Sequence, residues 1–490
     1  MKKYIIGIDE GTTSTRAVLF DCQKKDIVKI KNQKFSQFYP QSVWVEQNAE
    51  EIFDCVIYTI KEVLKEANVS LNEILSFAIT NQRETVVAWD KNTLKPVYNA
   101  IVWQCRRTSD FCASIPQNKK DLIRNKTGLL VDPYFSASKM KWILDNVPLA
   151  KKLNDEDNLR FGTIDTYLMA RLSNGEIFST DVTNASRTML MNIQTCEWDK
   201  ELLDIFDIKM SSLPNIKECS YDFGNAYIDG QTIPICGVIG DQQASLFGQG
   251  CFDQGQAKNT FGTGCFILIN TGEKLEINSN NLLSTVAWKL NGKTVYALEG
   301  SVFNAGSCIE WAKNDLKLIE DYKQANLCLE NNFDPNDIYF VPALTGLGAP
   351  YWSPDSRGLL VGLTRSTTNN DIMKAIVQSL VFSTNDILKE SSKITTLTEM
   401  SCDGGVCVNT NMLKFLADIT GLEIKVQSTL ESTVLGAIYM ACLKCGVFNG
   451  LEDIKNTIVW EKTFTQSITE ETKSRYIDGW NKAIKLCLLK

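Results

Sequence analysis

The sequence feature that most restricts the possible fold is a polar turn between two apolar runs. Residues 4–8 are apolar or β-branched, residues 9–15 read Asp-Glu-Gly-Thr-Thr-Ser-Thr, and residues 17–20 are apolar again. Glycine and small hydroxyl residues favour tight turns, so a β-hairpin with a polar tip is predicted. The tip offers a dense set of backbone N–H and hydroxyl donors, as phosphate oxygens require, although an ordinary polar hairpin is the alternative.

Charged residues flank this tip on both sides. Asp9 ends the first strand, where a carboxylate could hold Mg²⁺ directly or through water. Arg16 begins the second strand, where a guanidinium could neutralise phosphate charge.

Strand patterns alternate with long helical patterns, which predicts an α/β architecture. Helices are expected at residues 49–67 and at 371–389, the second one capped by Asn370. Hairpins are expected at residues 257–270, with a Gly/Thr-rich tip, and at 285–300 around Asn291-Gly292.

The chain has 490 residues, which is too long for one hydrophobic core. Two domains are therefore expected, residues 1–248 and 249–490, divided where a helical segment gives way to Gly-rich chain. No long linker marks the division, so the domains are expected to pack closely around a cleft.

The net charge is −7 and no long basic run occurs, which argues against nucleic acid as a partner. No apolar stretch reaches about 18 residues and no signal peptide is recognisable, so a cytoplasmic protein without membrane insertion is expected. The 16 cysteines are expected as reduced thiols. Cys442 and Cys445 form a lone CxxC, predicted as two thiols one helical turn apart rather than a redox pair or half a zinc site.

Histidine is absent from the whole sequence. A Ser-His-Asp or Cys-His arrangement is thereby excluded, and any general base near neutral pH is expected to be a carboxylate. Regulation by histidine phosphorylation is excluded as well.

Several polar segments follow apolar strands and carry candidate chemistry. Arg83 and Glu84 could donate to and accept from a polyol, or form a solvated loop ion pair. Asp241 follows the strand 235–239 and could present a base to a cleft, or cap a helix. The turns at 262–264 and 403–405 permit close approach of backbone to a ligand, or are plain turns.

Long ordered matches make the chain resemble the FGGY carbohydrate kinase family. They lie at residues 7–16, 79–85, 99–107, 183–190, 240–244, 345–352 and 403–405, and the two general family patterns lie at 134–143 and 358–378. The resemblance runs from Tyr4 to about Trp480. It implies two actin-like (RNase H-type ATPase) domains with mixed β-sheets flanked by helices and an active site in the cleft between them.

The resemblance also implies an activity, phosphorylation of glycerol by ATP to sn-glycerol 3-phosphate in glycerol uptake and catabolism. Mg²⁺ as cofactor and a homodimer or homotetramer are implied too, with Asp241 as general base and Asp9 at the metal. The residues implied for glycerol are Arg83, Glu84, Trp103, Tyr134, Asp241, Gln242 and Phe266. Those implied for phosphates and nucleotide are Thr12, Thr13, Ser14, Arg16, Thr263, Gly306, Glu310, Gly405 and Asn409.

Three positions depart from the family pattern. The family commonly has Gln at the position of Glu310, which weakens its assignment to the nucleotide, and Gln at the position of Glu10. The segment 227–232 is short and lacks the Gly-rich, Arg-bearing stretch of members inhibited by fructose 1,6-bisphosphate. We therefore expect no such inhibition.

Two other functions are compatible with parts of the sequence. Another FGGY kinase, acting on a pentulose or gluconate, would share the chemistry, although the surroundings of Arg83, Glu84 and Trp103 favour glycerol. An actin-like ATPase of a filament or chaperone would share the Asp-Gly-Thr turn but has no need for Arg83, Glu84 and Asp241 at a cleft.

Overall fold

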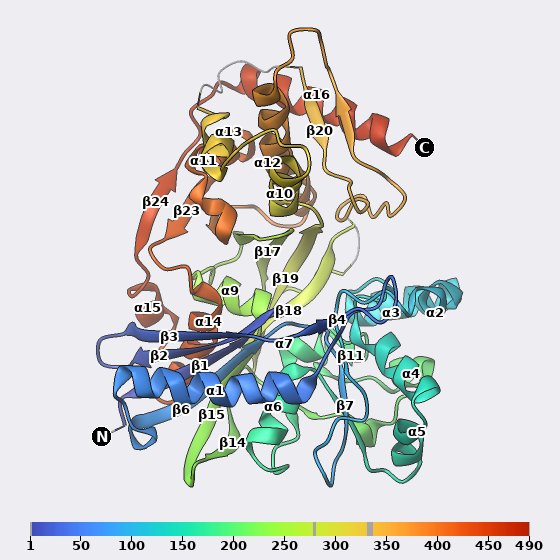
Figure 1. The fold of residues 1–490 in the computed structure, drawn as a ribbon, viewed down its shortest axis with the longest axis vertical. Helices are drawn as coiled ribbons and strands as arrows, with labels where there is room; N and C mark the ends of the chain where they lie inside the picture. Colours follow the sequence, from blue (N-terminus) through green and yellow to red (C-terminus); the bar gives the residue numbers. More distant parts are fainter. Residues whose placement is uncertain (1, 278–280, 331–336, 490) are drawn as a thin grey trace.

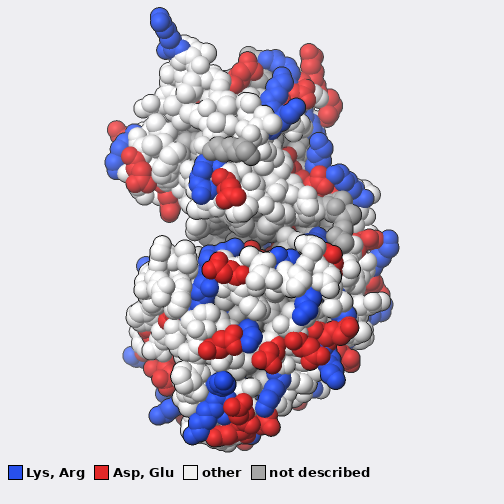
Figure 2. Space-filling model, turned by 90° about the vertical axis from the view of Figure 1, so that its right-hand side faces the viewer, with Lys and Arg blue, Asp and Glu red and all other residues white. Residues whose placement is uncertain are grey.

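The computed structural model describes residues 2–277, 281–330 and 337–489. Two mixed β-sheets with flanking helices form a lower and an upper part of an elongated molecule (Figure 1). In the space-filling view a groove runs between the two parts, and side chains of both charges are interspersed over this face (Figure 2). The predicted α/β class with mixed sheets flanked by helices is confirmed.

The first sheet has the strand order β14-β15-β6-β1-β2-β3. Strands β1, β2 and β3 pair antiparallel, whereas β6 and β15 run parallel to β1. The bounds are β1 Tyr4–Glu10, β2 Ser14–Asp21, β3 Asp26–Lys34, β6 Ile74–Asn81, β14 Ser220–Ile228 and β15 Gln231–Gly240.

The second sheet has the order β18-β19-β17-β16-β22-β23-β24. Its β16, β17 and β19 pair antiparallel, and β22 and β23 run parallel to β16, so the scheme of the first sheet is repeated. The bounds are β16 Gln256–Phe261, β17 Cys265–Gly272, β18 Leu283–Leu290, β19 Lys293–Val302, β22 Glu399–Asp403, β23 Glu423–Gln427 and β24 Trp460–Phe464.

Successive side chains of β1 point to opposite faces of the first sheet, and a different helix packs on each face. Ile6 and Ile8 pack with helix α1 (Ala49–Ala67), which has the predicted bounds and is capped by Asn48. Ile5 packs on the opposite face with helix α14 (Ser432–Lys444). Asp9 follows Ile5 and Gly7 on that second face, at the strand end.

Helix α14 therefore comes late in the sequence but covers the first sheet, where its ribbon lies in Figure 1. It approaches so closely that a Cβ on Gly237 of β15 would lie 2.6 Å from the carbonyl oxygen of Ala437. A Cβ on Gly436 would lie 2.0 Å from the carbonyl oxygen of Ala244 in α9 (Asp241–Gly248). Only glycine fits at these two crossings.

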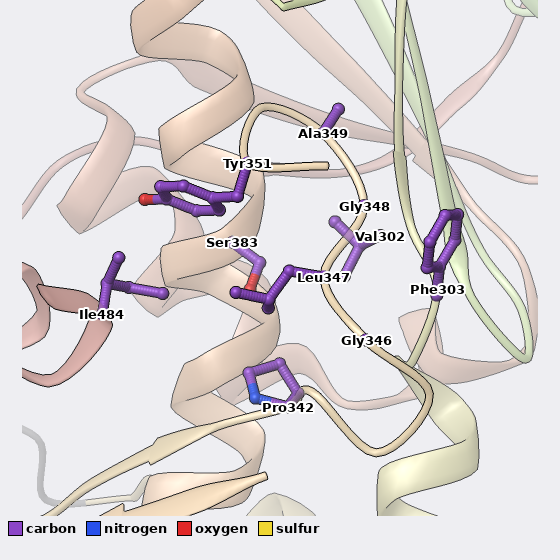
Figure 3. Close-up of a pocket in the computed structure, with 10 residues that line it drawn as sticks. All are labelled: Val302, Phe303, Pro342, Gly346, Leu347, Gly348, Ala349, Tyr351, Ser383 and Ile484. Atoms are coloured by element: carbon purple, nitrogen blue, oxygen red, sulfur yellow. The ribbon is translucent and has the colours of Figure 1, made fainter. Parts of the chain in front are cut away.

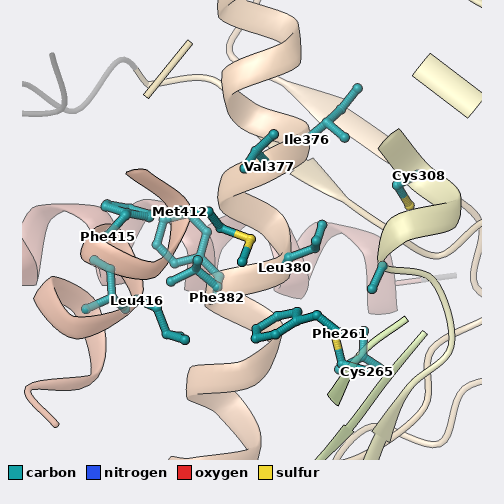
Figure 4. Packing of buried hydrophobic residues seen from close by; sticks show 14 of the residues in the cluster. Phe261, Cys265, Cys308, Ile376, Val377, Leu380, Phe382, Met412, Phe415 and Leu416 are labelled. Carbon is teal, nitrogen blue, oxygen red and sulfur yellow. The ribbon is translucent and has the colours of Figure 1, made fainter. Parts of the chain in front are cut away.

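The core of the upper part lies around helix α12 (Asn369–Ser391), with α13 (Thr410–Thr420) and α16 (Glu470–Leu488) against it. Phe382 of α12 stacks on Trp480 at 5.2 Å between ring centroids, and Phe415 of α13 meets Phe382 edge-on (Figure 4). The predicted cap Asn370 is wrong. Thr368 caps α12, because its hydroxyl accepts from the N–H of Asp371 and the Asp371 carboxylate accepts from the N–H of Thr368.

The cysteine prediction is confirmed where the structure tests it. All 16 cysteines are free, Cys442 lies buried in α14, and Cys445 is the residue after that helix. Over the described ranges, no three His, Cys, Asp or Glu side chains are grouped as metal ligands. None of the helices in these ranges is both long and apolar enough to cross a membrane.

The approach of α14 to α9 predicts a large effect of adding one methyl group. We expect Gly436→Ala to lower the free energy of unfolding by about 2 kcal/mol or more, because overpacking forces the two helices apart. Urea unfolding followed by circular dichroism measures this change. Gly450→Ala is the control, since a Cβ there meets nothing within 4 Å and should cost less than about 1 kcal/mol. Equal effects of both substitutions would contradict the tight helix crossing.

Candidate active site

The polar tip between β1 and β2 is held in place by side chains from elsewhere in the lower part. The carbonyl oxygen of Thr12 accepts from the amides of Gln37 and Gln47 at 2.8 and 2.7 Å. Trp103 donates its indole N–H to the Thr12 hydroxyl at 3.1 Å. Thr13 lies exposed at the tip, whereas Gly11, Thr12 and Ser14 are half-buried.

Asp9 and Arg16 lie at the base of this hairpin, as predicted. Arg16 Nη1 lies 3.1 Å from Glu431 Oε2 and 3.8 Å from Asp9 Oδ2. Glu431 immediately precedes α14, so this helix brings a carboxylate to the hairpin. Burial raises the pKa of Asp9 to about 6 against the opposing charge of Arg16, and the charge of Asp241 adds to the rise.

Arg83 and Glu84 follow β6 and are buried in a four-residue ion cluster, so the alternative of a solvated loop pair is wrong. Glu299 of β19 receives Arg83 Nη1 and Arg187 Nη2, each at 2.7 Å. Arg187 Nε also donates to Glu84 Oε1 at 2.6 Å. Burial alone would raise the pKa of Glu299, but the two guanidinium groups hold it at about 2.

Asp241 reaches the same cluster from the neighbouring strand. It is the first residue of α9, directly after β15, and its Oδ1 lies 3.2 Å from Arg83 Nε. Gly240 occupies the cap position, so the alternative of Asp241 as helix cap is wrong. The side chain of Asp241 is 28% exposed, whereas those of Arg83 and Glu84 are buried. Asp241 is therefore the solvent-accessible carboxylate beside the cluster. Burial raises the pKa of Asp241, against the lowering effects of Arg83 and Lys258.

Three aromatic rings from separate segments contact one another, and one of them, Tyr134, contacts Arg83. Trp103 meets Tyr134 at 5.6 Å and Phe266 at 6.2 Å between centroids, both edge-on. The Tyr134 hydroxyl accepts from Arg83 Nη2 at 3.5 Å. Phe266 belongs to β17 of the second sheet, so the apolar wall is built from both parts of the molecule.

The turn at 262–264 meets two other predicted nucleotide segments. The N–H of Gly306, the first residue of α10 (Gly306–Asn314), donates to the carbonyl of Gly262 at 3.0 Å. A Cβ on Gly306 would lie 2.6 Å from that oxygen and 3.3 Å from Val406, so only glycine brings the three together. Thr263 and Gly405 are exposed beside them.

Glu310 and Asn409, two further residues predicted to contact the nucleotide, differ from each other in burial. Glu310 lies exposed on α10. Asn409 is buried, caps α13 through the N–H of Met412, and donates its amide to the carbonyl of Ala325 at 3.0 Å. The side chain of Asn409 is thus engaged within the fold.

Sequence reasoning missed four polar residues of this region: Arg187, Gln243, Lys258 and Glu299. Gln243 accepts from Arg83 Nη1 at 3.1 Å. A signal existed for Glu299, since a carboxylate in the otherwise apolar stretch 295–300 needs a buried partner. The partner itself could not be read from the sequence.

A small pocket lies in the upper part, and its lining residues Val302 and Phe303 adjoin Gly264 of the turn at 262–264 (Figure 3). Val302, Pro342, Leu347, Tyr351 and Ile484 are among its lining residues. The lining is mostly apolar and the Tyr351 hydroxyl is donated to Asp386, so the pocket offers little to a phosphate or a polyol.

Known proteins match the whole length of the chain. Residues 4–248 match the N-terminal domain, and residues 257–445 the C-terminal domain, of the FGGY family of carbohydrate kinases. The chain is 46% identical to the glycerol kinase of Fusobacterium nucleatum, covering 99% of the chain and 98% of that relative. It is 45% identical to the glycerol kinase of Desulfitobacterium hafniense, with 99% of each covered.

Solved structures show the same architecture. Plasmodium falciparum glycerol kinase with ADP superimposes with a TM-score of 0.93 at 36% identity, covering 99% of the chain and 98% of that structure. The xylulose kinase of Lactobacillus acidophilus shares the fold, with a TM-score of 0.88 at 23% identity and coverage of 99% and 97%.

The repeated mixed sheets and the two hairpin tips define a two-domain protein of the actin-like ATPase fold. With both family domains matched in order over most of its length, the chain belongs to the FGGY family of carbohydrate kinases.

The buried ion cluster predicts a pH-dependent stability difference. We expect Glu299→Gln to lower the free energy of unfolding at pH 7 by about 3 kcal/mol or more, because two buried guanidinium groups lose their shared counter-charge. Because the pKa of Glu299 falls from 4.5 to about 2 on folding, its stabilisation is full above pH 4.5 and is lost as the pH falls toward 2. Denaturant unfolding of the unchanged chain and of Glu299→Gln at several pH values measures the difference between their free energies of unfolding. This difference should become smaller as the pH falls from 4.5 toward 2.

The exposed pair Lys31–Glu66 provides the control for this experiment. Glu66→Gln should change the free energy of unfolding by less than about 1 kcal/mol. A Glu299→Gln protein as stable as the unchanged chain at pH 7 would contradict the role of the cluster.

Proposed function

We propose that the chain transfers the terminal phosphoryl group of ATP to glycerol, forming sn-glycerol 3-phosphate for glycerol uptake and catabolism. The observation that carries the proposal is the partly exposed carboxylate of Asp241, which lies 3.2 Å from the buried Arg83 and follows a strand of the same sheet as the donor-rich hairpin tip. Identity of about 45% to glycerol kinases over the full chain supports the choice of substrate.

Glycerol is assigned to the space between the ion cluster and the aromatic wall. Arg83 and the amide of Gln242 supply donors, and Glu84 and Asp241 supply acceptors, for its hydroxyl groups. Trp103, Tyr134 and Phe266 cover its carbon chain. A few charge-assisted hydrogen bonds of about 1.5–3 kcal/mol each suffice for so small a ligand after the entropic costs.

Asp241 is assigned as the general base, because it is the accessible carboxylate of the cluster and the chain has no histidine. Phosphoryl transfer to an alcohol needs the hydroxyl oriented and its proton accepted late, which a positioned Asp can do. Arg83 lowers the pKa of this carboxylate against the larger raising effect of burial, and its Nε contacts the carboxylate at 3.2 Å. Closure of the groove would exclude water as a competing acceptor.

The phosphates are assigned to Thr12, Thr13, Ser14 and Arg16 on one side and to Thr263 on the other. Adenosine is assigned to the second domain, with Gly306, Glu310, Gly405 and Asn409. Mg²⁺ is usually held by one or two carboxylates together with substrate phosphates. Asp9 fits that donor set, and burial raises its pKa against the nearby charge of Arg16. When bound, the ion would neutralise phosphate charge.

The remaining organisation is proposed on the same basis. Residues 1–248 form the domain with the polyol site and phosphate hairpin, and residues 249–490 form the adenosine domain. We place the protein in the cytoplasm, where ATP is available and its free cysteines stay reduced, as a homodimer or homotetramer without nucleic-acid or membrane partners.

Removal of the base tests the mechanism directly. We expect Asp241→Asn to lower kcat for glycerol at least ~100-fold, because the amide cannot accept the hydroxyl proton. A coupled ADP-release assay measures the rate, and Asp253→Asn, a change in a surface pair with Lys455, is the control expected to leave it unaltered. Retention of full activity by Asp241→Asn would contradict the assignment.

The same assay separates the competing functions. Phosphorylation of a pentulose or gluconate in preference to glycerol would indicate another FGGY kinase. ADP release without a phosphorylated product would indicate an actin-like ATPase.

The segment 227–232 predicts insensitivity to fructose 1,6-bisphosphate. Ile228 pairs with Gln231, and Asp229 and Gly230 form a two-residue turn with φ values of 47° and 77°. So short a turn leaves no loop to surround a bisphosphate. We expect saturating fructose 1,6-bisphosphate to leave the initial rate unchanged, with inhibition by the product ADP as the positive control. Strong inhibition by the bisphosphate would refute this expectation.

A further inference from the structure

Lys258 is a fully buried lysine of β16 whose ammonium group faces Gln242. Its Nζ donates to the side-chain oxygen of Gln242 and, at 2.9 Å, to the hydroxyl of Thr260. Within the described ranges, the third N–H of this ammonium has no hydrogen-bond partner. A buried ammonium is costly unless it is paired, so a lysine at this position calls for an explanation beyond packing.

The contact with Lys258 decides which way the amide of Gln242 points. An ammonium group has three donors and no acceptor, so only the oxygen of the Gln242 amide can face it. The NH₂ group of the same planar amide is then turned away from Lys258. Beside it, Asp241 presents an acceptor, and the pair therefore offers one donor and one acceptor to adjacent hydroxyl groups.

Several charged groups near Lys258 influence the pKa of its ammonium group. Burial lowers the pKa of Lys258 to about 8, while the nearby carboxylates of Asp403 and Asp241 act in the opposite direction. Arg83 lowers this pKa as well, and Glu299 raises it. Lys258 comes from the second sheet and Gln242 from α9, so the contact ties the substrate-side helix to the sheet that carries the nucleotide turn.

We propose that Lys258 is a positioning residue that fixes the amide of Gln242 so that its N–H groups are directed at a hydroxyl of the polyol. This inference rests on the proposed phosphorylation of glycerol. Lys258 acts through Gln242 and does not itself touch the substrate. The donation from Lys258 Nζ to the Gln242 oxygen is the physical reason that we give for a buried lysine at this position.

The first test removes the ammonium while keeping an unbranched side chain of similar length. We expect Lys258→Met to raise KM for glycerol about 10- to 100-fold, the range for losing one well-oriented hydrogen bond to substrate. KM for ATP and the melting temperature are measured in parallel, and KM for ATP should change less than about threefold. Thr260→Val is the matched control, because it removes the other partner of Nζ and leaves the Gln242 contact intact.

A double-mutant cycle shows whether Lys258 acts through Gln242. Gln242→Leu should raise KM for glycerol as much as Lys258→Met does, and combining the two should add little to either alone. Independent, multiplicative effects of the two changes would overturn the inference. They would leave the proposed function intact, since the unchanged chain would still phosphorylate glycerol.

The substitution Gln242→Glu provides a test that keeps Lys258 in place, should Lys258→Met fail to fold. A carboxylate pairs with the ammonium but has no N–H to donate, so KM for glycerol should rise as in Gln242→Leu. A KM close to that of the unchanged chain would show that Gln242 only satisfies Lys258, and would overturn the inference. Absence of glycerol phosphorylation by the unchanged chain would instead refute the proposed function, and the inference with it.

Discussion

The buried pairing of two arginines with Glu299 is the interaction on which the arrangement of the site depends. Arg83 and Arg187 belong to the lower part of the molecule, and Glu299 belongs to the second sheet. Taking these charges out of water is expensive, and their close mutual contacts offset that cost. The cluster therefore joins the two sheets, and Asp241, which contacts Arg83, is a partly exposed carboxylate beside it.

Strand order explains why residues far apart in sequence converge at this place. Strands β1, β6 and β15 run parallel, with Asp9 opposite Thr80 and Gly240 opposite Asn81. Their carboxyl ends thus bring the polar hairpin tip, the Arg83-Glu84 pair and Asp241 to one edge of the sheet. Helix α14 lies on the same sheet, and Glu431, the residue before its first turn, contacts Arg16.

Much of the fold was predictable because local patterns were strong. The bounds of α1 and the turn at Asn291-Gly292 follow from apolar periodicity and from a dipeptide that adopts positive φ readily. The cap of α12 was misplaced by two residues, because two asparagines follow Thr368 and the reciprocal bonds with Asp371 are visible only in three dimensions. The candidate site residues that follow apolar strands were predictable from their residue types and positions. The side chains that they contact were not predictable.

The sequence by itself determined the helix at 49–67, the donor-rich turn, the absence of a histidine base and the family of the chain, because each depends on local composition or on ordered motifs. Only the tertiary structure decided that Arg83 is buried against Glu299, that Asn409 caps a helix, and that Lys258 orients Gln242. The physical reason is that a buried polar group must find its partner from a distant segment. The choice among possible partners is made by how the sheets and helices pack, which short-range sequence patterns do not encode.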